Sequence, residues 1–170
     1  MIRRAERGDG LEISRVRIES WRTTYQGQID QAFLDQMSPD QWAENWEKDF
    51  DQDEIFTYVA EIDNEIVGFA IAGESSEEDF PNHPYELMAI YLLKQHQNKG
   101  IGQKLVSKII ETFALKGDAG IHVWAFDDNP YCSFYKKLGG TPITQQVLKI
   151  QGKGYNETAY GWESIRDIRL

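Results

Sequence analysis

The chain has 170 residues and a formal net charge of -10. Its length fits one domain that buries a core of its own, and 41% hydrophobic with 12% aromatic residues excludes a disordered chain. The acidic balance argues against general nucleic-acid binding and leaves cationic small molecules or peptides as candidate ligands. Because Cys132 is the only cysteine and we see neither a signal peptide nor an apolar stretch of membrane-spanning length, we expect a cytoplasmic protein with no membrane partner.

Three helices are expected in the first third of the chain, after a short N-terminal strand. The expected ranges are 1–4 for the strand and 9–25, 30–36 and 38–50 for the helices. Asp9 with Glu12 predicts a capping box at the first helix, and Ser38 before Pro39 predicts the start of the third. Residues 39–54 are acidic, which either attracts a cationic amine or reflects a solvated face.

The middle of the chain predicts a β-hairpin followed by a strand–helix–strand unit. The expected strands are 55–62, 65–73, 85–93 and 121–126, and the expected helix is 100–115. Asp63 and Asn64 join the first two strands, since both tolerate the left-handed conformations of a tight turn. A strand, a crossover helix and a second strand make the last two strands parallel.

The tail predicts a short helix at 129–138 and two strands, 143–150 and 157–162, joined through Gly152 and Gly154. The whole pattern predicts one α/β domain over residues 1–170, with a mixed, mostly antiparallel central sheet and helices on both faces. Ligands of such sheets gather at the carboxyl ends of parallel strands, so residues 92–102 and 127–129 are expected at one cleft. Exposed tail strands make a homodimer possible.

Residues 97–102, between the buried strand and its helix, predict an anion-binding site. The first amides of a helix have no backbone partner, and the helix dipole adds positive charge there. Gly100 and Gly102 leave room for an anion. From residue 87 to residue 110 the chain has lysines but no acidic residue, which marks either an anion site or a solvated helix face. Phosphate or pyrophosphate suits the first interpretation.

The motif at this junction is neither of two common phosphate loops. The dinucleotide fingerprint needs a glycine where Leu105 stands, and no Gly-Lys-Ser or Gly-Lys-Thr occurs. The pattern Gln97-x-x-Gly100-x-Gly102 resembles the acyl-coenzyme A loop of the GNAT superfamily of N-acyltransferases. Residues 129–139, Asn-Pro-Tyr-Cys-Ser-Phe-Tyr-Lys-Lys-Leu-Gly, are similar to the segment after that family's fifth strand. The separation of the two motifs is also the family's, and the resemblance covers most of the chain.

This resemblance implies a GNAT-like fold whose parallel pair splays at the cofactor site. It implies an enzyme that transfers acetyl from acetyl-CoA to a primary amine, on a small molecule or a peptide, by direct attack in a ternary complex. Amides of residues 97–102 would bind the pyrophosphate. The strand end at Tyr91 and Leu92, together with Asn129, would bind the pantetheine arm. Lys99 and Lys104 either add charge at this site or are solvated. The implied cofactor-binding residues are Tyr91, Leu92, Gln97, Asn98, Lys99, Gly100, Ile101, Gly102, Lys104, Asn129 and Tyr135.

Two residues are predicted to carry the chemistry. Tyr135 is the expected acid for the departing thiolate, since a phenol with a pKa of about 10 stays protonated at neutral pH; the alternative is a half-buried packing aromatic. Glu86 is the expected base, directly or through water, or else a strand-end surface residue. Trp21, Arg22 and Tyr25 resemble the family's acceptor-side wall, although the spacing of the two aromatic residues also fits a core.

Other readings stay open at this point. A GNAT-like module that binds CoA without turnover is the main alternative, and a nucleotide-binding α/β domain is a weaker one. The three histidines show no metal-binding spacing, so no metal is expected. Asn98 and Gly140 depart from the glycine and phenylalanine usual in the family, which leaves open the backbone before Gly100 and the packing after Gly139.

Overall fold

The computed structural model describes residues 1–50 and 52–170. The chain forms two compact units: Met1–Ala72 with Ala89–Ile109, the first unit, and Gly73–Met88 with Ile110–Leu170, the second unit. That residues 1–170 form a single domain stays a prediction. Among the described residues, no helix combines the length and the apolar character needed to cross a membrane.

Within the described residues, seven strands follow the order β1-β2-β3-β4-β5-β7-β6. Their bounds are β1 Ile2–Arg4, β2 Ile55–Ile62, β3 Glu65–Glu74, β4 Tyr85–Leu92, β5 Ile121–Phe126, β6 Thr141–Ile150 and β7 Lys153–Trp162. Strands β4 and β5 pair in parallel, whereas β1 with β2, β5 with β7 and β6 with β7 are antiparallel. The predicted mixed, mostly antiparallel sheet with one parallel pair is confirmed.

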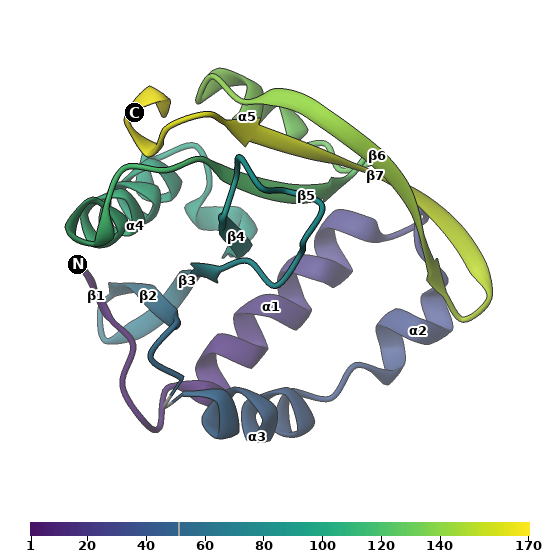
Figure 1. Cartoon of the computed structure of the whole chain (residues 1–170). Coiled ribbons are helices and arrows are strands. Elements are labelled where there is room, and N and C mark those ends of the chain that lie inside the picture. The colour runs from purple at the N-terminus through teal and green to yellow at the C-terminus, as the bar shows by residue number, and fades with distance from the viewer. Residues whose placement is uncertain (51) are drawn as a thin grey trace. The chain divides into compact units, whose positions relative to one another are not determined.

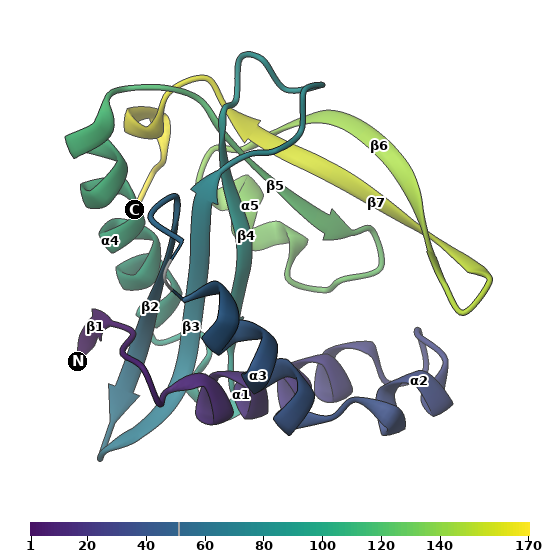
Figure 2. The same cartoon turned by 60° about the horizontal axis from the view of Figure 1, so that its bottom comes forward.

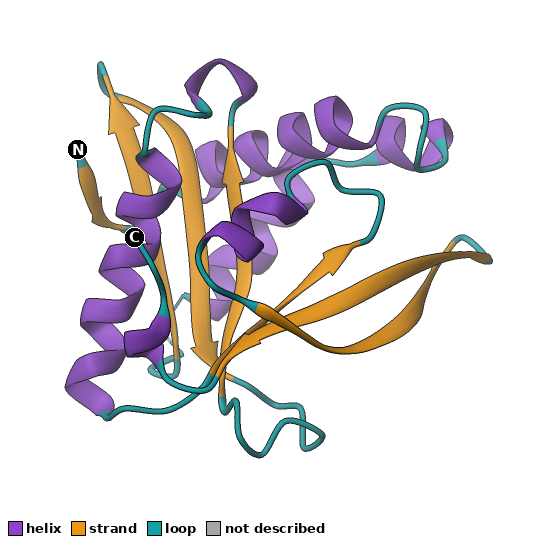
Figure 3. Ribbon diagram, turned by 90° about the horizontal axis from the view of Figure 1, so that it is seen from above, coloured by secondary structure: helices purple, strands orange, loops and turns teal. Residues whose placement is uncertain are grey.

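The first unit holds most of the helices. They are α1 (Gly10–Tyr25), α2 (Gln31–Gln36), α3 (Pro39–Asp49), the 3-10 turn η1 (Lys94–His96) and the start of α4 (Ile101–Lys116). Helices α1 and α3 lie side by side (Figures 1 and 2), and helices cover both sides of β2 and β3 (Figure 3). Val16 of α1 packs with Val59 and Phe69 of the sheet in a continuous core. Of the acidic range 39–54, residue 51 lies outside the described residues.

The two predicted helix caps turn out differently. Ser38 Oγ accepts a hydrogen bond from the Gln41 amide at 3.5 Å, so the predicted start of α3 is confirmed. Asp9 occupies the cap position of α1 but makes no side-chain cap. Its carboxylate instead accepts from Arg3 at 2.7 Å and from the Glu6 amide at 2.9 Å. The capping-box prediction was wrong because a nearby arginine competes for the carboxylate.

The second unit contains the long β6–β7 hairpin (Figure 2) and the short helices α5 (Cys132–Lys137) and η2 (Ile165–Asp167). Two predicted boundaries were wrong. Helix α5 begins at Cys132 because Asn129 Oδ1 accepts from the Tyr131 amide at 2.8 Å and closes a turn ahead of it. The tail strands are longer than predicted, since Gln151 and Gly152 make the turn with φ of 48° and 79°, and Gly154 lies in β7.

The packing after Gly139 depends on the glycine at position 140. A Cβ added to Gly140 would lie 2.8 Å from the ring of Trp162. That indole donates a hydrogen bond to the Leu138 carbonyl at 2.9 Å and is 4% exposed. Trp162 therefore fills the space next to Gly140, and the departure from the family's usual phenylalanine has a local explanation.

Candidate functional site

The segment 97–102, called the phosphate loop from here on, has the backbone that an anion site needs. Asn98 and Gly100 have φ of 58° and 76°, in the left-handed region that asparagine and glycine adopt most readily. Asn98 thus serves in place of the family's usual glycine. A Cβ at Gly100 would meet only Gln103 Oε1, at 3.9 Å, so the space before the helix is open.

Helix α4 starts directly after Gly100. The Lys104 amide donates to the Gly100 carbonyl at 3.1 Å, so the amides before it in the first turn precede the helical hydrogen-bond pattern. No acidic residue lies in that turn, and Lys99 and Lys104 are exposed. Backbone donors, helix dipole and charge therefore all favour an anion here.

The end of β4 is tied to the phosphate loop. The Leu92 carbonyl accepts from Gln97 Nε2 at 3.0 Å and from Ser20 Oγ at 3.3 Å, while the Leu93 amide donates to the Val67 carbonyl at 2.9 Å. The Gln97 side chain thus fixes the first residue of the loop against the strand it follows. This gives the glutamine of the motif a structural task within the first unit.

An aromatic cluster lies beside this strand end. Trp21 Nε1 donates to the Tyr91 hydroxyl at 2.9 Å, and its ring lies 5.0 Å from Tyr25 and 6.3 Å from Phe33 between centroids. Tyr25 is 4% exposed and belongs to the core, whereas Trp21 is half-buried. Of the two aromatic residues predicted in the acceptor wall, Trp21 is therefore the one that can present a surface.

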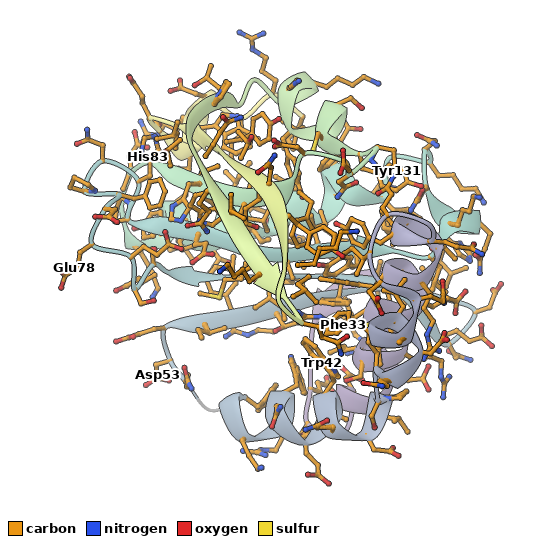
Figure 4. The ribbon with its side chains drawn as sticks, turned by 90° about the vertical axis from the view of Figure 1, so that its right-hand side faces the viewer. Phe33, Trp42, Asp53, Glu78, His83 and Tyr131 are labelled. Atoms are coloured by element: carbon orange, nitrogen blue, oxygen red, sulfur yellow. The ribbon has the colours of Figure 1, made fainter. Side chains whose placement is uncertain are left out.

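Three members of that cluster were not predicted: Arg17, Phe33 and Trp42. The Arg17 guanidinium lies 3.6 Å from the ring centre of Trp42 and 5.9 Å from that of Tyr91, and Phe33 and Trp42 come from α2 and α3 (Figure 4). Burial lowers the pKa of Arg17. Helical spacing along α1 places Arg17 and Trp21 on one face, a signal that was available but unused.

Tyr135, the predicted acid, lies on α5 in the second unit. It is 8% exposed, and its ring lies 6.0 Å from that of Tyr160 at an angle of 26°. Cys132 Sγ donates to the Phe126 carbonyl at 3.2 Å, and burial raises the pKa of this thiol. A protonated thiol is a poor nucleophile, so Cys132 is poorly suited to carry an acyl group.

Glu86, the predicted base, faces a histidine that the sequence reasoning set aside. The parallel register of β4 and β5 pairs Glu86 with His122, so their side chains share one face of the sheet. Glu77, from the loop after β3, completes a cluster whose ligand atoms all lie within 4.8 Å of one another. Burial, and secondarily the charge of Glu77, raises the pKa of Glu86, which makes this carboxylate a better proton acceptor.

The tautomer of His122 follows from its surroundings. Nδ1 lies 3.0 Å from the His83 carbonyl, which only accepts, so Nδ1 carries the proton. Nε2 is buried and has no hydrogen-bond partner among the described residues. Burial lowers the pKa of His122, against the opposing effect of the His83 and Tyr85 carbonyls and the charge of Glu77, so the ring favours the neutral form.

The predicted site residues divide between the two units. The first unit holds the phosphate loop, Lys104, Trp21, Tyr25, Tyr91 and Leu92, and the second holds Glu86, Asn129 and Tyr135. Glu77 and His122, which the structure brings to Glu86, were not predicted. The register of the parallel strands is the signal that would have found His122. No comparable signal pointed to Glu77, because it lies in a loop.

Known proteins resemble this chain over most of its length. Residues 17–140 match the family described as Acetyltransferase (GNAT) family. The uncharacterized N-acetyltransferase YuaI of Bacillus subtilis (strain 168) is 28% identical over 169 residues, 99% of this chain and 95% of the relative. PaiA N-acetyltransferase of Thermoplasma acidophilum, in complex with coenzyme A, superimposes with a TM-score of 0.69 at 21% identity, over 93% of this chain and 96% of that one. YncA of Salmonella typhimurium, a putative acetyltransferase with its cofactor acetyl-CoA, gives 0.71 at 20% identity, over 95% and 92%.

Proposed function

Because the chain belongs to the GNAT family of acetyltransferases, we propose that it transfers an acetyl group from acetyl-CoA to a primary amine by direct attack in a ternary complex. The observation that carries this proposal is the phosphate loop. It joins a strand end to an open helix N-terminus, with left-handed Asn98 and Gly100 and no acidic residue in the first turn. That arrangement suits the pyrophosphate of CoA.

The proposed cofactor is supported by the relatives. The Thermoplasma protein binds coenzyme A and the Salmonella protein acetyl-CoA. In this chain, amides of residues 97–102 hold the pyrophosphate, and Lys99 and Lys104 add charge. Tyr91, Leu92 and Asn129 serve the pantetheine arm.

The proposed chemistry needs a base for the amine and an acid for the departing thiolate. An alkylammonium with a pKa near 10 loses a proton to Glu86, directly or through water, and the neutral amine then attacks the thioester carbonyl. The C–N bond forms, the C–S bond breaks, and the Tyr135 hydroxyl donates its proton to the departing thiolate. The nitrogen loses its second proton as the amide forms, and that proton passes through solvent to the Tyr135 phenolate. The products are an amide and CoA with a free thiol.

The proposed acceptor is a small-molecule or peptide amine. Trp21, held by its hydrogen bond to Tyr91, offers a half-buried aromatic surface, with Tyr25 supporting it from the core. An aromatic ring attracts a cationic group, which agrees with the expectation of an amine.

A panel of amines tests the proposal: polyamines, aminoglycosides, amino acids and peptide N-termini. Purified protein is incubated with acetyl-CoA and each amine, thiol release is followed continuously, and the product is weighed by mass spectrometry. At least one amine should gain an acetyl group in a 1:1 ratio to the thiol released. Tight CoA binding with no transfer to any amine would instead support the non-catalytic module.

A further inference from the structure

Glu77, Glu86 and His122 bring two carboxylates and one imidazole to one place inside the second unit. The three ligand atoms lie within 4.8 Å of one another. They come from a loop, from β4 and from β5, so the fold and not the sequence spacing creates the group. We propose that this cluster binds a divalent transition-metal ion, with Zn²⁺ as its probe.

His122 has the state of a metal ligand. Its Nδ1–H points to the His83 carbonyl at 3.0 Å, which is the second hydrogen bond that ligating histidines commonly make. The other nitrogen, Nε2, keeps its lone pair and has no hydrogen-bond partner among the described residues, although the residue is 0% exposed. A buried imidazole nitrogen without a partner is costly, and a metal ion would satisfy it.

Glu77 is also held in place. Trp124 Nε1 donates to its two carboxylate oxygens at 3.0 and 3.3 Å. Trp124 lies two residues after His122 on β5, so both side chains use the same face of the sheet. An outer hydrogen bond of this kind orients a ligating carboxylate.

Glu86 supplies the third ligand. The register that pairs it with His122 fixes its place on the same face. In the described part of the chain, neither Glu77 nor Glu86 forms an ion pair. Two neighbouring carboxylates without a protein cation attract an external one.

The ligand types decide the class of ion. An imidazole with two carboxylates suits Zn²⁺, Co²⁺ or Mn²⁺, whereas Mg²⁺ and Ca²⁺ prefer oxygen ligands alone. With bonds of about 2.0–2.2 Å, tetrahedral Zn²⁺ holds its ligand atoms roughly 3.4 Å apart. Coordination would draw the ligand atoms, which lie within 4.8 Å of one another, closer together, and solvent would fill the remaining position.

Metal binding has one consequence that rests on the proposed function. A bound ion engages the lone pair with which Glu86 would act as a base, so saturating Zn²⁺ should lower the rate of acetyl transfer. The binding test below uses no acetyl-CoA, so it stands or fails separately from the catalytic proposal.

The test is a titration of chelator-stripped protein with Zn²⁺ by calorimetry, and with Co²⁺ by its visible absorption. We expect one ion per chain and no comparable binding of Mg²⁺. Glu77→Gln should weaken Zn²⁺ binding by at least about 100-fold, because a ligand is lost where outer-shell changes already cost about 10–100-fold. The matched control is Glu78→Gln, which removes the same charge from the next, exposed residue (Figure 4) and should bind as the wild type does.

A second variant separates coordination from simple charge attraction. Trp124→Phe keeps the ring and every ligand atom but removes the hydrogen bond to Glu77, so we expect about 10–100-fold weaker Zn²⁺ binding. Thermal unfolding with chelator present should show that each variant is folded. Three results would overturn the site. The first is no stoichiometric binding, and the second is equal affinity in the Glu77→Gln and Glu78→Gln proteins. The third is binding that survives Glu77→Gln but is lost in His96→Gln, at a histidine outside the cluster.

Discussion

The phosphate loop and the Glu77–Glu86–His122 cluster are built in opposite ways. The loop is a run of consecutive residues, 97–102, and we propose that it binds an anion through backbone amides, so it depends on side chains being small or turned away. The cluster joins a loop and two strands, and its work is done by side chains. A site made of consecutive backbone groups can be recognised in the sequence as a motif. A site made of side chains that are distant in the sequence can be recognised only when the strand register is known. Substitutions should therefore affect the two regions differently.

Tyr135→Phe should have the largest effect, because it removes the hydroxyl proposed to protonate the thiolate. Tyr135 lies in a segment of consecutive motif residues, like the phosphate loop, but it is proposed to act through its side chain, like the cluster. We expect the rate of acetyl transfer to fall by about 10²–10⁴, the usual range for a proton-transfer group. Affinity for CoA, measured by calorimetry, should hardly change. The control is Tyr131→Phe, at an exposed tyrosine of the same segment. Full activity of Tyr135→Phe would remove the phenol from the mechanism.

Gly100→Glu should nearly abolish CoA binding, in agreement with a site made of backbone. A carboxylate would occupy the open space before α4 and repel the pyrophosphate. Like charges brought together cost several kcal/mol, or about 10³-fold in affinity. The measurement is CoA affinity by calorimetry.

Gly27→Glu is the matched control for that change. Gly27 has a φ of 79° against 76° for Gly100, and no atom lies within 4 Å of its added Cβ. Both variants therefore carry the same backbone strain and the same charge. Equal loss of affinity in the two would mean that the loop does not hold the pyrophosphate.

The influence of Glu77 on Glu86 should appear in the pH dependence of acetyl transfer. If Glu86 is the base, acetyl transfer rises with pH through a pKa that burial and Glu77 hold above the ordinary glutamate value of about 4.3. Removing the like charge in Glu77→Gln makes ionisation of Glu86 easier, so the acid limb should move to lower pH. Chelator excludes metal effects, and neutral His122 stays in place. An unmoved limb, or the same shift in Glu78→Gln, would contradict this role.

Much of the fold was predictable because local rules fixed it. Asp63 and Asn64 adopt φ of 52° and 65° as a tight hairpin requires, and the crossover made β4 and β5 parallel. The misplaced features were local competitions that a sequence does not reveal. Arg3 took the Asp9 carboxylate away from the helix cap, and Asn129 closed a turn before α5.

The site was predictable only in part for a related reason. Gln97, Gly100 and Gly102 are readable since one short segment contains the whole of the proposed anion site. His122 was passed over because no second ligand lies near it in the sequence, and only the pairing with Glu86 brings one. Arg17 and Trp42 meet through the packing of α1 against α3, which periodicity alone does not specify.

Replacing the lysines of the proposed anion site should have the smallest effect on CoA affinity. These changes test whether the phosphate loop acts through its backbone amides or through side-chain charge. Lys99 and Lys104 are exposed, and exposed charge pairs contribute about 0.2–1 kcal/mol, so each change to alanine should weaken CoA binding less than about sixfold. Added salt should shrink that difference further, since it screens exposed charges. Lys149→Ala, at an exposed lysine of β6, is the control. If the double variant instead lost about 100-fold or more, the loop would act through side-chain charge, as the cluster does, and the contrast between backbone and side-chain sites would fail.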